Sequence, residues 1–439
     1  MKRSVCIVLL WIVFSFTGKV FGQHKPDEYF EHLQHHRKFM GSAAISFNDS
    51  IIYTKSVGYA DAGTKKPLSA DTRFRIGSIT KTFTAVLILQ AIEEKKLALD
   101  DKLGYYYPSV KNAAAITIEQ LLKHRSGIVN FTELDSTYKW EEGYHNREEF
   151  LAYISDRKSD FEPGTAYAYS NTNYVLLAFI LEQVYQLPFD LILEKKICQP
   201  LGLKNTYYSF ETDTARNEAI SYNIQDRYIR NTRVNFSNHP GGGGMVSTAA
   251  EVNIFLSALF NGKLISPQSL ETMLPVNRGA YGMGIQKLDF SSPNGYEHSG
   301  RIENYISEYW YFPKEKLGIV TLANAININI SEINLVLLQY TYGTKPELPD
   351  FNRIPGFTDT AFSKLKGTYF DRSGKVSVTI SSDSRQLILQ KSTTRQDWIP
   401  FEHKGAANFE YDNISLRFFP ERKEVVIAQN GITEVYSKE

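Results

Sequence analysis

The sequence predicts an α+β protein: an antiparallel sheet flanked by helices, a mainly helical subdomain, and then a small all-β domain. Residues 41–60 alternate in polarity around Asn48 and Asp49, which is typical of a β-hairpin. Residues 281–324 show further strand patterns, and the region between is mostly helical. Strands far apart in the sequence are therefore expected to pair in one sheet.

The composition is that of an ordinary globular protein, and the charge and histidine patterns indicate neither a nucleic-acid partner nor a metal site. Among 439 residues, 42% are apolar and 22% are charged, which is enough to build a substantial core. The formal net charge is +1 and no Lys/Arg-rich block occurs, so we expect no nucleic-acid partner. The nine histidines show no His-Glu-x-x-His or similar ligand spacing, so neither a metal nor another cofactor is predicted.

The N-terminus has the pattern of a secretory signal. Lys2 and Arg3 precede the apolar run Val5–Phe16, and tolerated cleavage residues end at Gly22. The run is short for a transmembrane helix, although a retained anchor is the alternative. We expect a signal peptide at 1–22, export to the periplasm or the exterior, and no stable membrane span after cleavage.

The middle of the chain is predicted to be helical. Residues 82–99, TFTAVLILQAIEEKKLAL, are apolar on nearly every side through Ile92, as in a buried central helix. A shorter helix is expected from Thr117 to Gly127, and a second long helix from about Asn173 to just before Pro188. Ser78 is thus expected at or near the first turn of the buried helix.

The remaining segments complete the predicted division of the chain into four units. Glycines 241–244 form a turn before a helix from about Thr248, without the residues of a phosphate-binding loop. A last helix is expected at about 330–342, and a Pro- and Gly-rich linker follows it. Short strands then predict a small sandwich or barrel. The predicted units are 1–22 (signal), 23–342 (α+β domain), 343–356 (linker) and 357–439 (all-β domain).

Ser78 and Lys81 are the first candidates for catalysis. Residues three apart on a helix share a face, so the Lys81 amine can reach the Ser78 oxygen. The helix N-terminus favours a developing alkoxide, and burial would lower the pKa of Lys81. The alternative, favoured when the pattern is taken alone, is a helix cap beside a solvated lysine. Three other pairs share this spacing but lie in polar or solvated stretches: Ser136–Lys139, Ser155–Lys158 and Ser363–Lys366.

Two further clusters carry possible chemistry. Tyr169 and Asn171 precede a long helix, and both can point into one cavity from a short loop. Tyr169 could relay a proton if a neighbouring ammonium lowered its pKa, and Asn171 could donate to a substrate carbonyl. The alternative is a packed tyrosine and a helix cap. A lone histidine, such as His124, is more often structural, and we expect it to order a loop.

The third cluster lies at the end of a predicted late strand. His298, Ser299 and Gly300 stand in the segment YEHSGRIENY, where Gly300 lets a substrate backbone lie alongside. The N–H of Arg301 would then point to the same place as the N–H of Ser78. Two such donors form an oxyanion hole. A structural hydrogen bond is the alternative role of His298.

The order of the three clusters resembles the serine β-lactamase and penicillin-binding-protein superfamily. Within it, the chain is most similar to the class C β-lactamase-like branch, which carries Tyr-x-Asn as its second element and often His-x-Gly as its third. The resemblance covers about residues 25–340 and implies the β-lactamase/transpeptidase-like fold. It rests on the segments FRIGSITKTFTA, LLKHRSGI, PGTAYAYSNTNYVLL, GGGGMVSTAAE and LGIVTLAN.

The resemblance implies a role for each matching residue. Ser78 is the acylated nucleophile, Lys81 and Tyr169 share the general-base and proton-return steps, and Asn171 positions substrate. Substrate also lies along the sheet edge formed by His298, Ser299, Gly300 and Arg301. A lysine at the first of these positions would bind a substrate carboxylate, whereas histidine is a weaker, pH-dependent anion partner.

The expected function is that of an exported serine hydrolase acting through an acyl-enzyme. The implied substrates are small peptides of D-amino-acid or cell-wall type, esters or amides, and efficient penicillin hydrolysis is doubtful because His298 replaces lysine. The alternatives are a true β-lactamase or D,D-carboxypeptidase, and an inactive penicillin-binding-like receptor or scaffold. Neither the acyl donor nor the oligomeric state is determined by the sequence.

Overall fold

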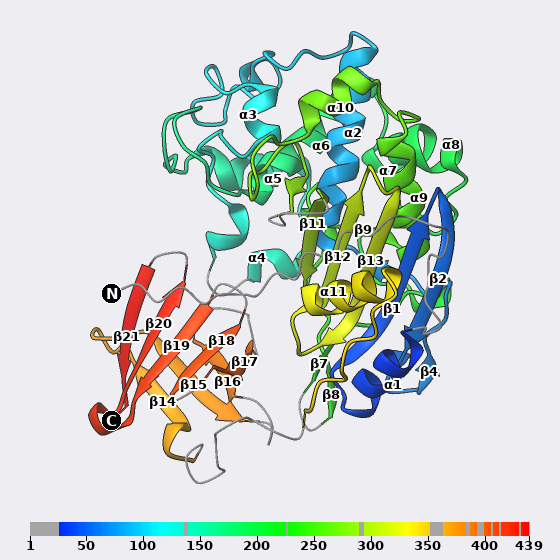
Figure 1. Cartoon of the computed structure of the whole chain (residues 1–439). Helices are drawn as coiled ribbons and strands as arrows, with labels where there is room; N and C mark the ends of the chain where they lie inside the picture. Colours follow the sequence, from blue (N-terminus) through cyan, green and yellow to red (C-terminus); the bar gives the residue numbers. More distant parts are fainter. Residues whose placement is uncertain are drawn as a thin grey trace.

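The fold is described from a computed structural model of the chain (Figure 1). The predicted signal peptide and residues 352–356 of the predicted linker lie outside the described residues. The described residues are 26–135, 139–224, 227–288, 294–351, 363–382, 387–392, 399–404, 407–411, 414–429 and 432–438.

A six-stranded antiparallel sheet forms the centre of the first domain. Its strand order is β10-β11-β12-β13-β1-β2, so the two N-terminal strands pair with strands from the end of the domain. Figure 1 shows this as blue strands beside yellow and green ones. The strands are β1 (Phe39–Phe47), β2 (Ser50–Val57), β10 (Gln286–Lys287), β11 (Tyr296–Ile302), β12 (Tyr305–Phe312) and β13 (Leu317–Ile326).

Helices cover both faces of this sheet. On one face, α2 (Thr80–Glu93) and α9 (Ala249–Phe260) share a core cluster with Ala44 and Val320. On the other face, α1 (Asp27–His35) and α11 (Ile330–Thr341) pack on the alternate residues of the same strands. The α2 segment is buried along nearly its whole length, which is why its sequence is apolar on every side.

The helical subdomain packs against α2. Its long helix α6 (Asn171–Tyr185) contacts α2 and α3 (Ile118–Leu122), and it begins two residues before the predicted start. The other helices of this part are α4 (Lys139–Glu142), α5 (Arg147–Ser155), α7 (Phe189–Leu193), α8 (Gln199–Leu201) and α10 (Pro267–Met273). Single turns are η1 (Gly77–Ile79), η2 (Leu103–Tyr105), η3 (Phe131–Glu133), η4 (Glu194–Cys198), η5 (Thr214–Arg216) and η6 (Phe236–Asn238).

Three small sheets brace the segments around the central sheet. The order β5-β9-β6 joins the strand before Ser78 to two later segments. The strands of these sheets are β3 (Tyr59–Asp61), β4 (Lys66–Pro67), β5 (Phe74–Arg75), β6 (Tyr207–Tyr208), β7 (Tyr222–Ile224), β8 (Tyr228–Arg230) and β9 (Met245–Ser247). Within the described residues no single helix is long and apolar enough to cross a membrane. Taken together, α6 and the segment 189–201 have the length and apolar composition of a membrane span, but the two are bent by 77° relative to each other.

The C-terminal region is a closed antiparallel barrel, so of the two predicted all-β forms the barrel is found. The pair Phe370–Ser437 between β14 and β21 closes it, and Tyr369, Phe409 and Phe418 fill its interior. The predicted α+β class with an all-β tail is confirmed. The barrel elements are β14 (Gly367–Phe370), β15 (Ser377–Ser382), β16 (Leu387–Lys391), β17 (Ile399–His403), β18 (Asn408–Tyr411), β19 (Ile414–Phe419), η7 (Pro420–Arg422), β20 (Glu424–Gln429) and β21 (Ile432–Ser437).

Candidate active site

Ser78 lies in the single turn η1, directly before α2. Its side chain is partly exposed, whereas Gly77 and Ile79 on either side are buried. Gly77 has φ +48°, and a Cβ there would lie 2.7 Å from the backbone nitrogen of Arg301. Only glycine fits this close, left-handed position. The turn therefore presents Ser78 to solvent while its backbone lies against β11.

Lys81 is completely buried, and its amine contacts three oxygens. Nζ lies 3.0 Å from Ser78 Oγ, 2.8 Å from Asn171 Oδ1 and 2.6 Å from the Gly242 carbonyl. Burial lowers the pKa of Lys81 well below its ordinary value. In its uncharged form the amine can donate two N–H groups to the amide and carbonyl oxygens and turn its lone pair to the Ser78 hydroxyl. This is the arrangement of a nucleophile with its general base.

Tyr169 contacts the same serine from the opposite segment. Its hydroxyl donates to Ser78 Oγ at 2.8 Å. Burial raises the pKa of Tyr169, so the condition set for its proton relay, a pKa lowered by a neighbouring ammonium, is not met. The physical reason is that desolvation of the Tyr169 hydroxyl outweighs the lowering effect of its hydrogen bond to Ser78. Tyr169 thus keeps its proton and is suited to donate one.

Asn171 is the first residue of α6, and its amide faces Lys81. Oδ1 accepts from Lys81 Nζ, while Nδ2 donates to Thr132 Oγ1 over 3.4 Å. The backbone N–H of Asn171 donates to Asn130 Oδ1 at 3.0 Å. The residue before it, Ser170, is the helix N-cap but makes no side-chain cap bond. Asn171 therefore joins the cluster with Ser78 and Lys81, as its predicted position requires.

His298 is buried and uncharged, which corrects its expected behaviour as a pH-dependent anion partner. Burial lowers the pKa of His298 to about 3. Its Nδ1–H donates to the Ser299 carbonyl at 2.6 Å, because a carbonyl only accepts. Nε2 then accepts from the Tyr281 hydroxyl at 3.1 Å. Both ring nitrogens are therefore already engaged by protein groups.

Gly300 brings strand β11 into contact with the nucleophile's turn. A Cβ at this position would lie 2.2 Å from the Ile76 carbonyl oxygen and 2.8 Å from the Ser78 nitrogen. No side chain fits there, so the backbone of Arg301 lies against the same turn. The backbones of Ser78 and Arg301 thus lie close together, and an oxyanion hole formed by their two N–H groups stays a prediction.

The side chains of Ser299 and Arg301 leave β11 on the other face of the sheet. Ser299 pairs with Glu308, whose carboxyl oxygens accept from the α11 residues Ser331 and Asn334. Both Ser299 and Arg301 are exposed, in alternation with the buried residues of the strand. The structure thus brings the backbone of Arg301 to Ser78, whereas substrate binding through these two side chains stays a prediction.

Two groups near Ser78 were missed by sequence reasoning. The Gly242 carbonyl binds Lys81, but a backbone oxygen has no residue signature, and the glycine run 241–244 was its only signal. Tyr281 bonds His298 and packs its ring 6.1 Å from that of Tyr169. It precedes a short strand that carried no catalytic motif.

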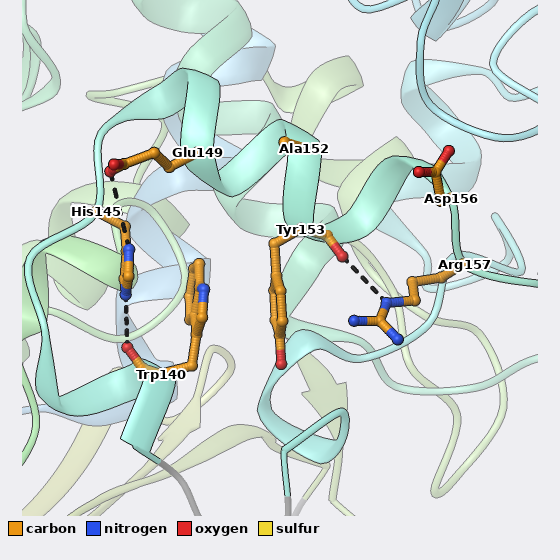
Figure 2. Close-up of a pocket in the computed structure, with 7 residues that line it drawn as sticks. All are labelled: Trp140, His145, Glu149, Ala152, Tyr153, Asp156 and Arg157. Atoms are coloured by element: carbon orange, nitrogen blue, oxygen red, sulfur yellow. Dashed lines mark hydrogen bonds and ion pairs between the residues drawn. The ribbon is translucent and has the colours of Figure 1, made fainter.

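A separate, open cavity of about 550 Å³ lies beside α4 and α5 (Figure 2). In it, the Trp140 ring is stacked between His145, at 4.0 Å, and Tyr153, at 4.3 Å. Arg157 lies 5.2 Å from the Tyr153 ring on the outside of this stack. Both faces of the Trp140 ring are thus covered by protein groups, and none of the predicted site residues lines this cavity. Among the described residues, no cluster of three or more His, Cys, Asp or Glu could hold a metal ion.

The chain is similar in sequence to known proteins over most of its length. A sequence model of the family described as β-lactamase matches residues 27–327. The chain is 28% identical over 305 residues to the putative penicillin-binding protein PbpX of Bacillus subtilis, covering 69% of this chain and 75% of that protein. Several further relatives are longer, and the match spans 63% of their length.

Two solved structures are similar in fold. The octameric penicillin-binding protein homologue from Pyrococcus abyssi gives a TM-score of 0.64 at 24% identity, covering 92% of this chain and 98% of that one. The D-amino acid amidase from Ochrobactrum anthropi, complexed with L-phenylalanine, gives a TM-score of 0.61 at 25% identity, covering 67% and 90%. The first of these similarities extends over the C-terminal barrel region as well.

Proposed function

The chain belongs to the β-lactamase family of serine hydrolases, and we propose that it cleaves acyl donors through an acyl-enzyme on Ser78. The observation that carries this proposal is the buried amine of Lys81, 3.0 Å from Ser78 Oγ and without an ion-pair partner among the described residues. An uncharged lysine at that distance is a base for the serine hydroxyl.

The proposed reaction follows from these contacts. Lys81 takes the Ser78 proton while Oγ forms a bond to the substrate carbonyl carbon, and the carbonyl oxygen becomes an oxyanion held by the N–H groups of Ser78 and Arg301. The bond to the leaving group then breaks, and that group takes its proton from Tyr169, which Lys81 reprotonates. Water then attacks the carbonyl carbon of the acyl-enzyme ester while Lys81 takes its proton. The bond to Ser78 Oγ breaks, Oγ takes a proton back, and the acid and free Ser78 are released.

We infer that the acyl donors are peptides, amides or esters, of D-amino-acid or cell-wall type. The support is His298, which is uncharged and has both nitrogens engaged, so the site lacks the cation that lysine would offer a carboxylate at this position. The similarity to a D-amino acid amidase points the same way. Export to the periplasm or the exterior, where cell-wall fragments occur, is part of the proposal and rests on the N-terminal sequence.

Turnover of three acyl donors tests this function. We expect hydrolysis of a p-nitrophenyl ester and of a D-amino-acid p-nitroanilide, both lost in Ser78→Ala, and slow or no turnover of a fluorescent penicillin. Rapid penicillin turnover would support the alternative of a true β-lactamase. Absence of turnover and of labelling with all three donors would instead support an inactive receptor.

A further inference from the structure

His124 is not one of the residues assigned to the reaction, and its ring is surrounded by those of four tyrosines. It follows α3, is completely buried, and lies in left-handed backbone at φ +53°. Its ring centroid is 4.3 Å from that of Tyr169 and 4.7 Å from that of Tyr281, with two more rings farther away. The other two are Tyr174, at 5.2 Å, and Tyr167, at 6.2 Å.

The hydrogen bonds of His124 fix its tautomer. The backbone N–H of Ser170 donates to Nδ1 at 3.2 Å, and a backbone N–H never accepts. Asn173 Nδ2 also lies 3.2 Å from Nδ1, and the Asn173 oxygen is already used by the Ser126 hydroxyl at 2.7 Å. Nδ1 is therefore an acceptor and Nε2 carries the hydrogen. Burial lowers the pKa of His124 well below its ordinary value, so that this acceptor persists.

These contacts hold the catalytic tyrosine on three sides. The N–H of Ala168 donates to the His124 carbonyl at 3.1 Å, and the N–H of Ser170 donates to Nδ1. The residues immediately before and after Tyr169 are thus tied to one histidine, and the Tyr169 ring packs on the imidazole. Nε2 has no hydrogen-bond partner among the described residues, so all hydrogen bonds of the ring are made by Nδ1.

We propose that His124 is a positioning residue that fixes the Tyr169 hydroxyl 2.8 Å from Ser78 Oγ. The inference rests on the proposed function, because it assigns a partner to the proton donor of that reaction. Misplacement of a reacting group by about 1 Å costs on the order of a hundredfold in rate. Loss of the Nδ1 acceptor is therefore expected to lower kcat while leaving KM nearly unchanged.

A double-mutant cycle in the full chain tests the proposal with a p-nitrophenyl ester. We expect His124→Phe, which keeps an aromatic ring but removes the acceptor, to lower kcat roughly 10- to 100-fold. In a Tyr169→Phe background, the same change should lower kcat by less than about threefold, since residues that act as one unit are not additive. Thermal unfolding of all four proteins measures their folding separately.

Conservative replacements provide the matched controls. The side-chain oxygen of His124→Asn takes the place of Nδ1 and should restore most of the lost kcat, whereas His124→Gln places its amide farther out and should not. If His124→Phe does not fold, the same double-mutant cycle with Tyr169→Phe is measured with His124→Gln instead. An equal loss of kcat in both Tyr169 backgrounds, or no loss at all, would overturn the proposal. If Ser78→Ala keeps the ester activity, the proposed function itself fails, which is a distinct result.

Discussion

Replacing Lys81 with methionine is expected to lower kcat/KM for an ester substrate by about 10³–10⁴-fold. Methionine fills a similar volume but cannot take the Ser78 proton, which Lys81 Nζ receives over 3.0 Å. The loss should approach that of Ser78→Ala, because the two residues act as one unit. In the unmodified protein, activity should fall as the pH drops through the lowered pKa of Lys81, since a protonated amine accepts no proton.

The chain offers a matched control for this change. Lys158 stands three residues after Ser155, in the same Ser-x-x-Lys spacing, but is exposed and lies beyond the end of α5. Lys158→Met should leave kcat/KM unchanged. Steady-state kinetics of both variants, with thermal unfolding alongside, make the comparison. More than a tenth of the original activity in Lys81→Met would show that another group is the base.

Replacing Arg75 with methionine is expected to lower the free energy of unfolding of the first domain by about 3–5 kcal/mol. Arg75 and Glu218 form an ion pair at 3.3 Å whose side chains are 1% and 2% exposed. Arg75 also donates to the carbonyls of Ser209 and Gly244 and lies 3.9 Å from the Phe236 ring. Methionine leaves the Glu218 carboxylate buried without its cation, which is the costly part of the change.

Thermal or denaturant unfolding measures this effect. A midpoint lowered by roughly 5–10 °C is expected for Arg75→Met. Lys196→Met is the control, because its pair with Glu94 is about one-third exposed and contributes at most about 1 kcal/mol. Adding Glu218→Gln to Arg75→Met should recover part of the loss. The account of this pair fails if the two single changes, Arg75→Met and Lys196→Met, lower stability equally.

The fold class was predictable because each level of the sequence agrees with it. The buried helix α2 is apolar on all sides, and strand patterns at both ends of the domain pair in one sheet. The choice between a sandwich and a barrel was not predictable, because it depends on whether the first and last strands of the region pair. In the structure they do, through Phe370 of β14 and Ser437 of β21. A closing pair between distant strands leaves no local pattern.

The identity of the site residues could be predicted from the sequence, but their charge states could not. Position at the head of a buried helix selected Ser78 from four equal spacings, and the structure places Lys81 and Tyr169 at its oxygen. The charge state of His298 depends on its burial, and its Nε2 is engaged by the hydroxyl of Tyr281 from a separate segment. Such surroundings arise from tertiary packing, which is why the predicted pH-dependent role was wrong.

The central claim is that Ser78 carries the acyl group. Its most direct measurement is mass spectrometry of the protein quenched in acid during turnover of a p-nitrophenyl ester. The account predicts a mass increase equal to the acyl group, located after proteolysis on the peptide that contains Ser78 and absent from Ser78→Ala. Turnover with an acyl group on a different residue, or an undiminished adduct in Ser78→Ala, would contradict it.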